Sequence, residues 1–300
     1  MFRHTPLLLI PVVLAACSPA PPAARSSPAP SPASPPVLSP VPSPVLSPAP
    51  SPAAPRRRLA VARTELKFQR GKDRPLPTTV WYPTEGTEPF PLVVFSHGLT
   101  SEPSAYESVL RSWAAAGFVV AAPTFPHTHY RAKNFDALDV INQPADVSTV
   151  ITRMLATDDA GRIDPHRIAA AGHSAGGITT LGLFAGGRDD RLTAGIVLSG
   201  RLVLNLPFTG DPAPMLFVHG KRDRTVPYAD GLAAFDAVPW PKAMMAVTEG
   251  GHVAITKDFD PVIATTTDFL RYALYGDAAA RNRLPSDARK GSRATLIDRL

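Results

Sequence analysis

Between residues 59 and 276, short and nearly continuous apolar runs alternate with amphipathic stretches. A short apolar run is typical of a strand buried on both faces, and apolar residues at helical spacing are typical of a helix with one buried face. The predicted strands are Thr78–Tyr82, Leu92–Ser96, Phe118–Ala122, Arg167–Gly172, Ala194–Leu198, Met215–Val218 and Ala243–Val247. The predicted helices are Ser104–Ala116, Asp146–Ala156, Ala175–Ala185 and Pro261–Leu274. This alternation predicts one α/β domain with a mostly parallel central sheet and helices on both faces.

The first 16 residues have the pattern of an export signal. Arg3 and His4 give a basic start, and the apolar run that follows is too short to span a bilayer as a mature helix. Residues 14–17, Leu-Ala-Ala-Cys, resemble the lipobox of bacterial lipoproteins, which implies cleavage before Cys17 and attachment of lipid to it. The alternative is an ordinary signal with a thiol near the cut. We expect an exported protein, anchored by lipid to the outer face of a bacterial membrane.

Residues 17–58 are predicted to be a disordered linker, because Pro, Ser and Ala dominate them and favour extended backbone. O-glycosylation of this segment stays open. Residues 277–300 are predicted to be a basic tail, which contributes with Arg56–Arg58 to the net charge of +6. No basic stripe is interleaved with exposed aromatics, so no nucleic-acid partner is expected. Cys17 is the only cysteine, so the exported domain has no intrachain disulfide.

One short stretch suggests catalysis. Residues 170–178 read A-A-G-H-S-A-G-G-I and place Ser174 between Gly172 and Gly176, after a predicted strand and before a predicted helix. A tight G-x-S-x-G turn in that context is a nucleophile elbow, which presents the serine hydroxyl at the carboxyl edge of the sheet. A Cβ at either glycine would clash with a neighbouring strand or helix. The alternative is a glycine-rich turn that serves only close packing.

Two further loops supply partners for the serine. Asp223 follows one predicted strand in H-G-K-R-D-R-T-V-P, and His252 follows the next in T-E-G-G-H. Serine needs a base to take its proton. In folds with a nucleophile elbow, the three residues follow one another along the chain in the order serine, acid, histidine. His252 would transfer the proton, and Asp223 would orient the imidazole of His252 and stabilise its charged form. We also expect the backbone N–H groups of Leu99 and Ala175 to form the oxyanion hole.

With these residues the chain resembles the α/β-hydrolase superfamily, and most closely its dienelactone hydrolase-like, cutinase-like polyester hydrolase and platelet-activating-factor acetylhydrolase-like branches. The resemblance rests on V-V-F-S-H-G, A-A-G-F-V-V-A-A-P, G-H-S-A-G-G, H-G-K-R-D-R-T-V-P and G-G-H. It implies a serine hydrolase of carboxylic esters that needs no cofactor. The chain departs from the secreted polyester hydrolases, which commonly carry a disulfide in this domain.

The loop 200–214 is too short for a helical cap domain, which favours an open cleft and esters of short to medium acyl chains or a polymeric ester. A monomer is also expected. Phe125, His127 and Tyr130 are the expected pocket walls. His127 and His129 could suggest a metal, but no further cluster has ligand spacing, so none is expected. His173 and His219 are expected to pack. A peptidase or amidase on the same scaffold and a catalytically silent surface-binding module are the alternatives.

Overall fold

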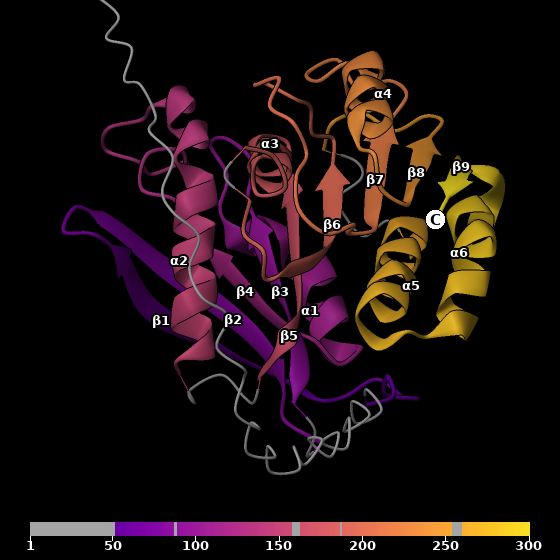
Figure 1. Ribbon diagram of the computed structural model, residues 1–300, viewed down its shortest axis with the longest axis horizontal. Coiled ribbons are helices and arrows are strands. Elements are labelled where there is room, and N and C mark those ends of the chain that lie inside the picture. Colours follow the sequence, from indigo (N-terminus) through magenta and orange to yellow (C-terminus); the bar gives the residue numbers. More distant parts are fainter. Residues whose placement is uncertain (1–51, 87–88, 158–162, 187, 254–259) are drawn as a thin grey trace, which may run out of the picture. The chain divides into compact units, whose positions relative to one another are not determined.

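A nine-stranded mixed sheet forms the centre of the computed structural model, which describes residues 52–86, 89–157, 163–186, 188–253 and 260–300 (Figure 1). The strands are β1 (Val61–Arg70), β2 (Arg74–Pro83), β3 (Phe90–Ser96), β4 (Val119–Pro123), β5 (Ile163–His173), β6 (Leu192–Leu198), β7 (Met215–Gly220), β8 (Lys242–Val247) and β9 (Ala294–Arg299). Their order is β1-β2-β4-β3-β5-β6-β7-β8-β9. The predicted signal peptide, Cys17 and most of the predicted linker lie outside the described residues.

The middle of this sheet is parallel, and its edges are antiparallel. From β4 through β3, β5, β6 and β7 to β8, each neighbouring pair runs parallel. The pairs β1–β2, β2–β4 and β8–β9 are antiparallel. The parallel strands therefore end at one common edge, and the segments that follow them meet there, as is usual for ligand sites in open α/β sheets.

Helices cover both faces of the sheet. The α-helices are α1 (Glu107–Ala115), α2 (Gln143–Leu155), α3 (Ala175–Gly182), α4 (Tyr228–Ala237), α5 (Asp260–Tyr275) and α6 (Ala278–Arg289). The 3₁₀ turns are η1 (Pro103–Tyr106), η2 (Ala137–Ile141) and η4 (Lys290–Ser292). Helices α1, α5 and α6 share one hydrophobic core with the sheet, and α2, α3 and α4 share the other. The mixed α/β architecture predicted from the sequence is thus confirmed.

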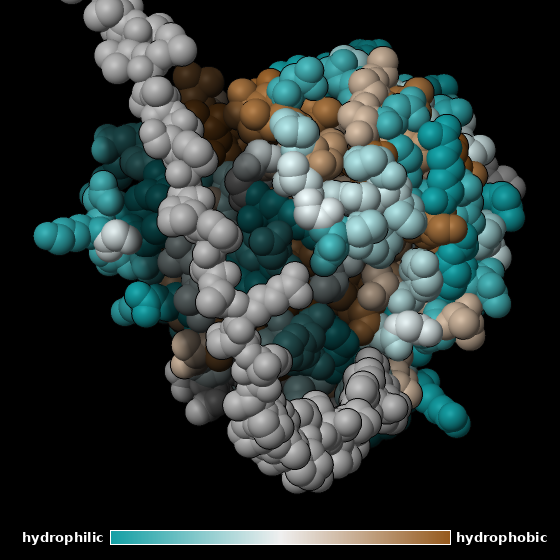
Figure 2. Space-filling view, in the orientation of Figure 1, coloured by the Kyte–Doolittle hydropathy of each residue, from teal (hydrophilic) through white to brown (hydrophobic). Residues whose placement is uncertain are grey.

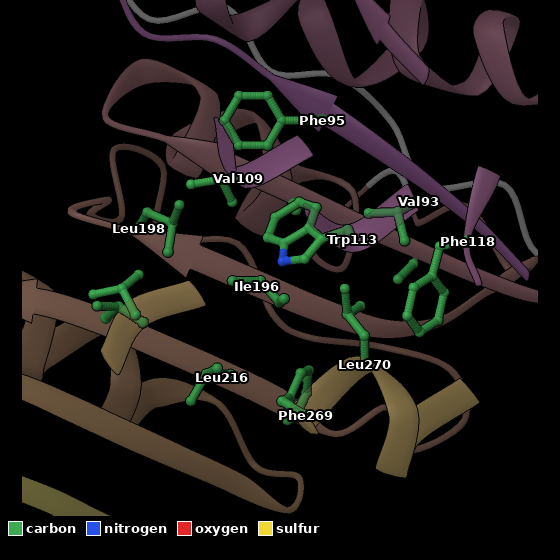
Figure 3. Packing of buried hydrophobic residues seen from close by; sticks show 14 of the residues in the cluster. Val93, Phe95, Val109, Trp113, Phe118, Ile196, Leu198, Leu216, Phe269 and Leu270 are labelled. Carbon is green, nitrogen blue, oxygen red and sulfur yellow. The ribbon is translucent and has the colours of Figure 1, made fainter. Parts of the chain in front are cut away.

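Alternation along the central strands divides their side chains between the two cores. In β3, for example, Val93 and Phe95 face one core while Leu92 and Val94 face the other. Trp113 of α1 lies in the first core beside Phe95 and residues of β6 and α5 (Figure 3). Burial on both faces explains why these strands read as unbroken apolar runs.

The C-terminal segment differs from the expected basic tail. Residues 278–289 form α6, and β9 pairs with β8 at the edge of the sheet. Asp277 caps α6 by accepting a hydrogen bond from the N–H of Ala280 at 3.0 Å. The apolar residues that α6 buries are small or widely spaced among arginines, and Pro285 lies inside the helix, so the sequence pattern is weak. No helix of the described chain is long and apolar enough to cross a membrane.

A core substitution in α6 tests whether this segment belongs to the folded domain. Leu284 is fully buried, so Leu284→Ala should lower the free energy of unfolding by about 2–5 kcal/mol, through lost apolar burial and the cavity it leaves. Urea unfolding measures the change. Leu138→Ala is the control, because Leu138 is 75% exposed and its loss should cost no more than about 0.5 kcal/mol. Equal, small effects of both changes would show that residues 277–300 are a tail.

Candidate active site

The serine of the G-x-S-x-G stretch lies in a strained turn between β5 and α3. Ser174 has φ 57° and ψ −117°, a backbone conformation that residues other than glycine rarely adopt. Such strain costs about 1–3 kcal/mol and persists only where the surroundings hold it. Here the N–H of Ser174 donates to the carbonyl of Leu198 in the adjacent strand at 2.9 Å. The turn leaves the serine between the end of β5 and the start of α3, at the carboxyl edge of the sheet.

The two flanking glycines are required by space. A Cβ built on Gly172 would lie 2.1 Å from the carbonyl oxygen of Gly176, and a Cβ on Gly176 would lie 1.9 Å from that of Ser96. Both distances are far inside van der Waals contact with backbone atoms that cannot rotate away. The steric reason given for this pattern from the sequence therefore holds, and α3 packs directly against β3 and β5.

Ser174, His252 and Asp223 are in hydrogen-bonded contact, although 78 residues separate the first two. The Nε2 of His252 lies 2.8 Å from the Oγ of Ser174, and its Nδ1 lies 2.7 Å from Oδ2 of Asp223. A carboxylate only accepts, so Nδ1 carries the proton and donates. Nε2 then has a free lone pair and accepts from the serine hydroxyl. This is the geometry that a base needs in order to activate a serine.

Asp223 is held as a buried carboxylate. Its side chain is 0% exposed, and its Oδ1 accepts hydrogen bonds from the N–H groups of Thr225 and Val226, both at 2.9 Å. Burial raises the pKa of Asp223, but the hydrogen bonds from His252, Val226 and Thr225 outweigh it and leave that pKa below its usual range. Asp223 is therefore charged at neutral pH and can stabilise a positive charge on His252.

Backbone contacts bring the loops of Asp223 and His252 together. The N–H of Lys221 donates to the carbonyl of Val247 at 2.8 Å, and that of Arg222 donates to Gly250 at 3.0 Å. A Cβ on Gly220 would lie 2.2 Å from the carbonyl oxygen of Gly250, so the close approach needs glycine there. Since β7 and β8 are parallel neighbours, the two loops leave the same edge of the sheet.

The loop after β3 passes beside the serine. A Cβ on Gly98 would lie 3.2 Å from the Cβ of Ser174, which places the Gly98 backbone against the elbow. His97 is buried and accepts a hydrogen bond at Nε2 from the N–H of Phe125, while its Nδ1 lies 2.8 Å from the carbonyl oxygen of Gly98. Within the described residues, neither the N–H of Leu99 nor that of Ala175 donates to another protein group.

Residues 57–199 match the family model named Chlorophyllase. That family is α/β-hydrolase-like, and the match indicates a hydrolase of esters. It covers just under half of the 300-residue chain and ends one residue after β6. The matched part therefore contains Ser174 and its elbow, whereas Asp223 and His252 lie beyond it. No curated protein matches the chain.

None of the expected pocket residues lines the cavity that is described below. Phe125 is fully buried beside His97, in the core that α2, α3 and α4 share with the sheet. The expectation that Phe125 forms a pocket wall is therefore corrected. His127 lies with its Nδ1 3.0 Å from the carbonyl oxygen of Asn134, and Tyr130 is exposed with Arg131 over its ring. The apolar character of Phe125 suited a core as well as a pocket, and the sequence alone did not distinguish them. Among the described residues, no three His, Cys, Asp or Glu side chains are grouped as metal ligands would be.

A cavity of about 520 Å³ lies instead between η2, α2, α3 and the loop that follows β6. Its apolar lining includes Ile141, Ile178, Leu181, Leu202, Leu204 and Leu206. Ile178 is one helical turn from the serine, and its N–H donates to the carbonyl of Ser174 at 3.1 Å. Figure 2 shows apolar surface near the top of the view, in the region where Figure 1 places the loop that follows β6. The sequence signal for this cavity is L-V-L-N-L at 202–206, leucines in a loop without a helix.

Burial of His97 predicts a pH dependence of stability. Burial lowers the pKa of His97 from 6.5 to about 4, so the unfolded chain binds a proton at mildly acidic pH while the folded chain does not. Folding stability should then fall as the pH drops from about 6.5 towards about 4, by up to about 1.4 kcal/mol per pH unit from this imidazole. Urea unfolding at several pH values should give a shallower slope for His97→Gln than for the wild type. Identical slopes would contradict the assignment of a neutral His97.

Proposed function

We propose that this protein hydrolyses carboxylic esters through an acyl-enzyme formed on Ser174. The observation that carries the proposal is the unbroken contact from the Ser174 hydroxyl through the His252 imidazole to the buried Asp223 carboxylate. The strained turn at Ser174 supports it, because such strain in a non-glycine residue is typical of active sites. The match of residues 57–199 to a family of ester hydrolases supports the class of reaction.

In this reaction the Oγ of Ser174 attacks the carbonyl carbon of the ester while its proton passes to Nε2 of His252. The oxyanion of the tetrahedral intermediate accepts hydrogen bonds from the N–H groups of Leu99 and Ala175. The C–O bond to the leaving group then breaks, and protonated His252 gives its proton to the departing alcohol. Water attacks the acyl-enzyme by the same steps with His252 as base, and releases the acid and free Ser174.

The apolar cavity beside α3 bears on the substrate. An apolar cavity of this size is typical of sites for small ligands, and it begins one helical turn from Ser174. We propose that it holds the apolar part of the acyl group, in esters of short to medium acyl chain. The open site without a cap domain, the lipid anchor at Cys17 and the exported location remain proposals that rest on the sequence.

Peptidase or amidase activity on the same residues is the second enzymatic candidate, and a silent binding module is the third. A matched pair of ester and amide substrates with the same acyl group distinguishes an esterase from a peptidase or amidase. A silent module would hydrolyse neither substrate.

Replacement of the serine tests the proposed nucleophile. Ser174→Ala should lower kcat on a p-nitrophenyl ester by about 10⁶-fold, because no other group can form the acyl-enzyme. The measurement is the release of p-nitrophenol. Ser286→Ala, at an exposed serine of α6, is the matched control and should keep the wild-type rate. A Ser174→Ala protein that retained most of the activity would exclude Ser174 as the nucleophile.

Filling the cavity tests where the acyl chain binds. Ala145 lines the cavity from the exposed side of α2, so Ala145→Trp should block it without disturbing the core. We expect kcat/KM to fall about tenfold or more for p-nitrophenyl esters of medium acyl chains and to change less than about twofold for the acetate, since a few lost apolar contacts suffice for that ratio. Arg153→Trp, farther along α2 and outside the cavity lining, is the control. An unchanged chain-length profile would show that the acyl group binds elsewhere.

A further inference from the structure

A buried chain of hydrogen bonds joins the loop after β3 to the loop that carries His252. The N–H of Gly98 lies 3.1 Å from Oη of Tyr106, and that oxygen lies 3.0 Å from Nδ1 of His173. On the other side of the ring, Nε2 of His173 lies 2.8 Å from the backbone carbonyl oxygen of His252. Tyr106 and His173 are both 4% exposed, so the chain is shielded from solvent.

The donors in this chain are fixed by the groups at its two ends. The carbonyl of His252 can only accept, so Nε2 of His173 carries the proton and donates to it. Burial lowers the pKa of His173 to about 4, so the imidazole is neutral at neutral pH and its Nδ1 accepts. Tyr106 therefore donates its hydroxyl proton to Nδ1, while its oxygen accepts from the N–H of Gly98. Each polar group in the chain then has a partner of the right kind.

Gly98 is held from both sides as a result. Its N–H donates to Tyr106, and its carbonyl oxygen is within hydrogen-bond distance of Nδ1 of His97. The carbonyl of Gly98 and the N–H of Leu99 belong to one planar, trans peptide unit and point in opposite directions. The contact with His97 therefore sets the direction of the Leu99 N–H, and the contact with Tyr106 holds the preceding His97–Gly98 peptide.

His173 also occupies a central place in the site. It directly precedes Ser174 in the chain, and its ring centroid lies 4.9 Å from that of His252. One side chain thus contacts the loop of the proposed oxyanion donor and the loop of the proposed base, and lies next to the proposed nucleophile. A reaction that depends on all three needs them fixed to within about 0.5 Å.

We propose that Tyr106 and His173 are positioning residues for the ester hydrolysis: together they fix the His97–Gly98 peptide, which precedes Leu99, and the backbone of His252 relative to Ser174. The inference rests on the proposed function. Neither residue touches the substrate or exchanges a proton with it. Their loss should therefore lower kcat, which depends on alignment in the transition state, and leave KM nearly unchanged.

Tyr106→Phe removes the central oxygen of the chain, together with its hydrogen bond to the side chain of Ser101. We expect kcat on a p-nitrophenyl ester to fall about 5- to 50-fold, with KM within about twofold of the wild type, because the buried N–H of Gly98 loses its partner. Tyr275→Phe is the matched control, since it removes a buried tyrosine hydroxyl that donates to the carbonyl of Gly117, outside the candidate site. The control should lose stability without losing kcat. A Tyr106→Phe protein with the kcat of the control would overturn the proposal.

Two replacements of His173 separate its two contacts. Gln places a donor near the position of Nε2 and can keep the bond to His252, whereas Asn places an acceptor near Nδ1 and loses that bond. We expect His173→Asn to lose more kcat than His173→Gln, by about fivefold or more. Equal losses would show that the bond to the His252 carbonyl does not position the base.

Amide hydrogen exchange at Gly98 tests the chain without any substrate. Exchange should be faster by about tenfold or more in Tyr106→Phe than in the wild type and in Tyr275→Phe. Unchanged exchange would overturn the chain itself. If exchange changes but the wild-type protein hydrolyses no ester, or Ser174→Ala remains active, the proposed function fails. The chain would then be structural, and its role in positioning would be refuted.

Discussion

The whole site depends on the close packing of α3 against β3 and β5, which leaves no space for a Cβ at Gly172 or Gly176. Ser174 can hold its positive φ only because α3 begins immediately after it and lies against the two strands. Side chains at Gly172 and Gly176 would occupy the space of backbone carbonyls. If α3 moved away to admit a Cβ, the N–H of Ala175 and the hydroxyl of Ser174 would move with it. The small residues thus fix the positions of the proposed nucleophile and of one proposed oxyanion donor together.

Buried neutral imidazoles extend this rigidity to the surrounding loops. His97 joins backbone groups of two loops, and His173 joins the backbone carbonyl of His252 to the hydroxyl of Tyr106. Burial lowers the pKa of each imidazole to about 4. A neutral imidazole donates at one nitrogen and accepts at the other, so it can join a carbonyl to an N–H or a hydroxyl across a gap too wide for a direct bond. A protonated ring would offer two donors and break the pattern. Low pKa values in these two residues therefore serve structure.

The apolar pattern predicted the centre of the sheet but not its edges. Strands such as β3 and β6 are buried on both faces and read as apolar runs, whereas β1 (VARTELKFQR) alternates charged and half-buried residues at the sheet edge. Edge strands β1 and β9 were missed for that reason. Helices α4 and α6 were missed because each buries only three residues, most of them small. Ser174, Asp223 and His252 could be predicted because each follows a parallel strand, which fixes where it lies.

The role of Tyr106 could not be predicted, because its contact with His173 spans 67 residues and leaves no local pattern. His173 was expected to pack, and it does, but its polar partners come from loops whose paths the sequence does not reveal. The cavity was missed for a related reason. Its walls come from η2, α2, α3 and the loop after β6, and only their packing creates the space between them.

The wall of that cavity that η2 and α2 form is held in place by partly buried ion pairs with an arginine of β2. Arg74 of β2 donates two hydrogen bonds to Asp139 of η2, both at 2.8 Å, and also bonds Asp146 in the first turn of α2. Hydrogen bonds to these carboxylates raise the pKa of Arg74, and Arg70 pairs with Asp146 as well. Removal of one partner from such a buried set leaves an uncompensated charge, which costs more than an apolar contact would. The edge hairpin, far from Ser174 in the sheet, thereby fixes the segment that forms the outer wall of the cavity.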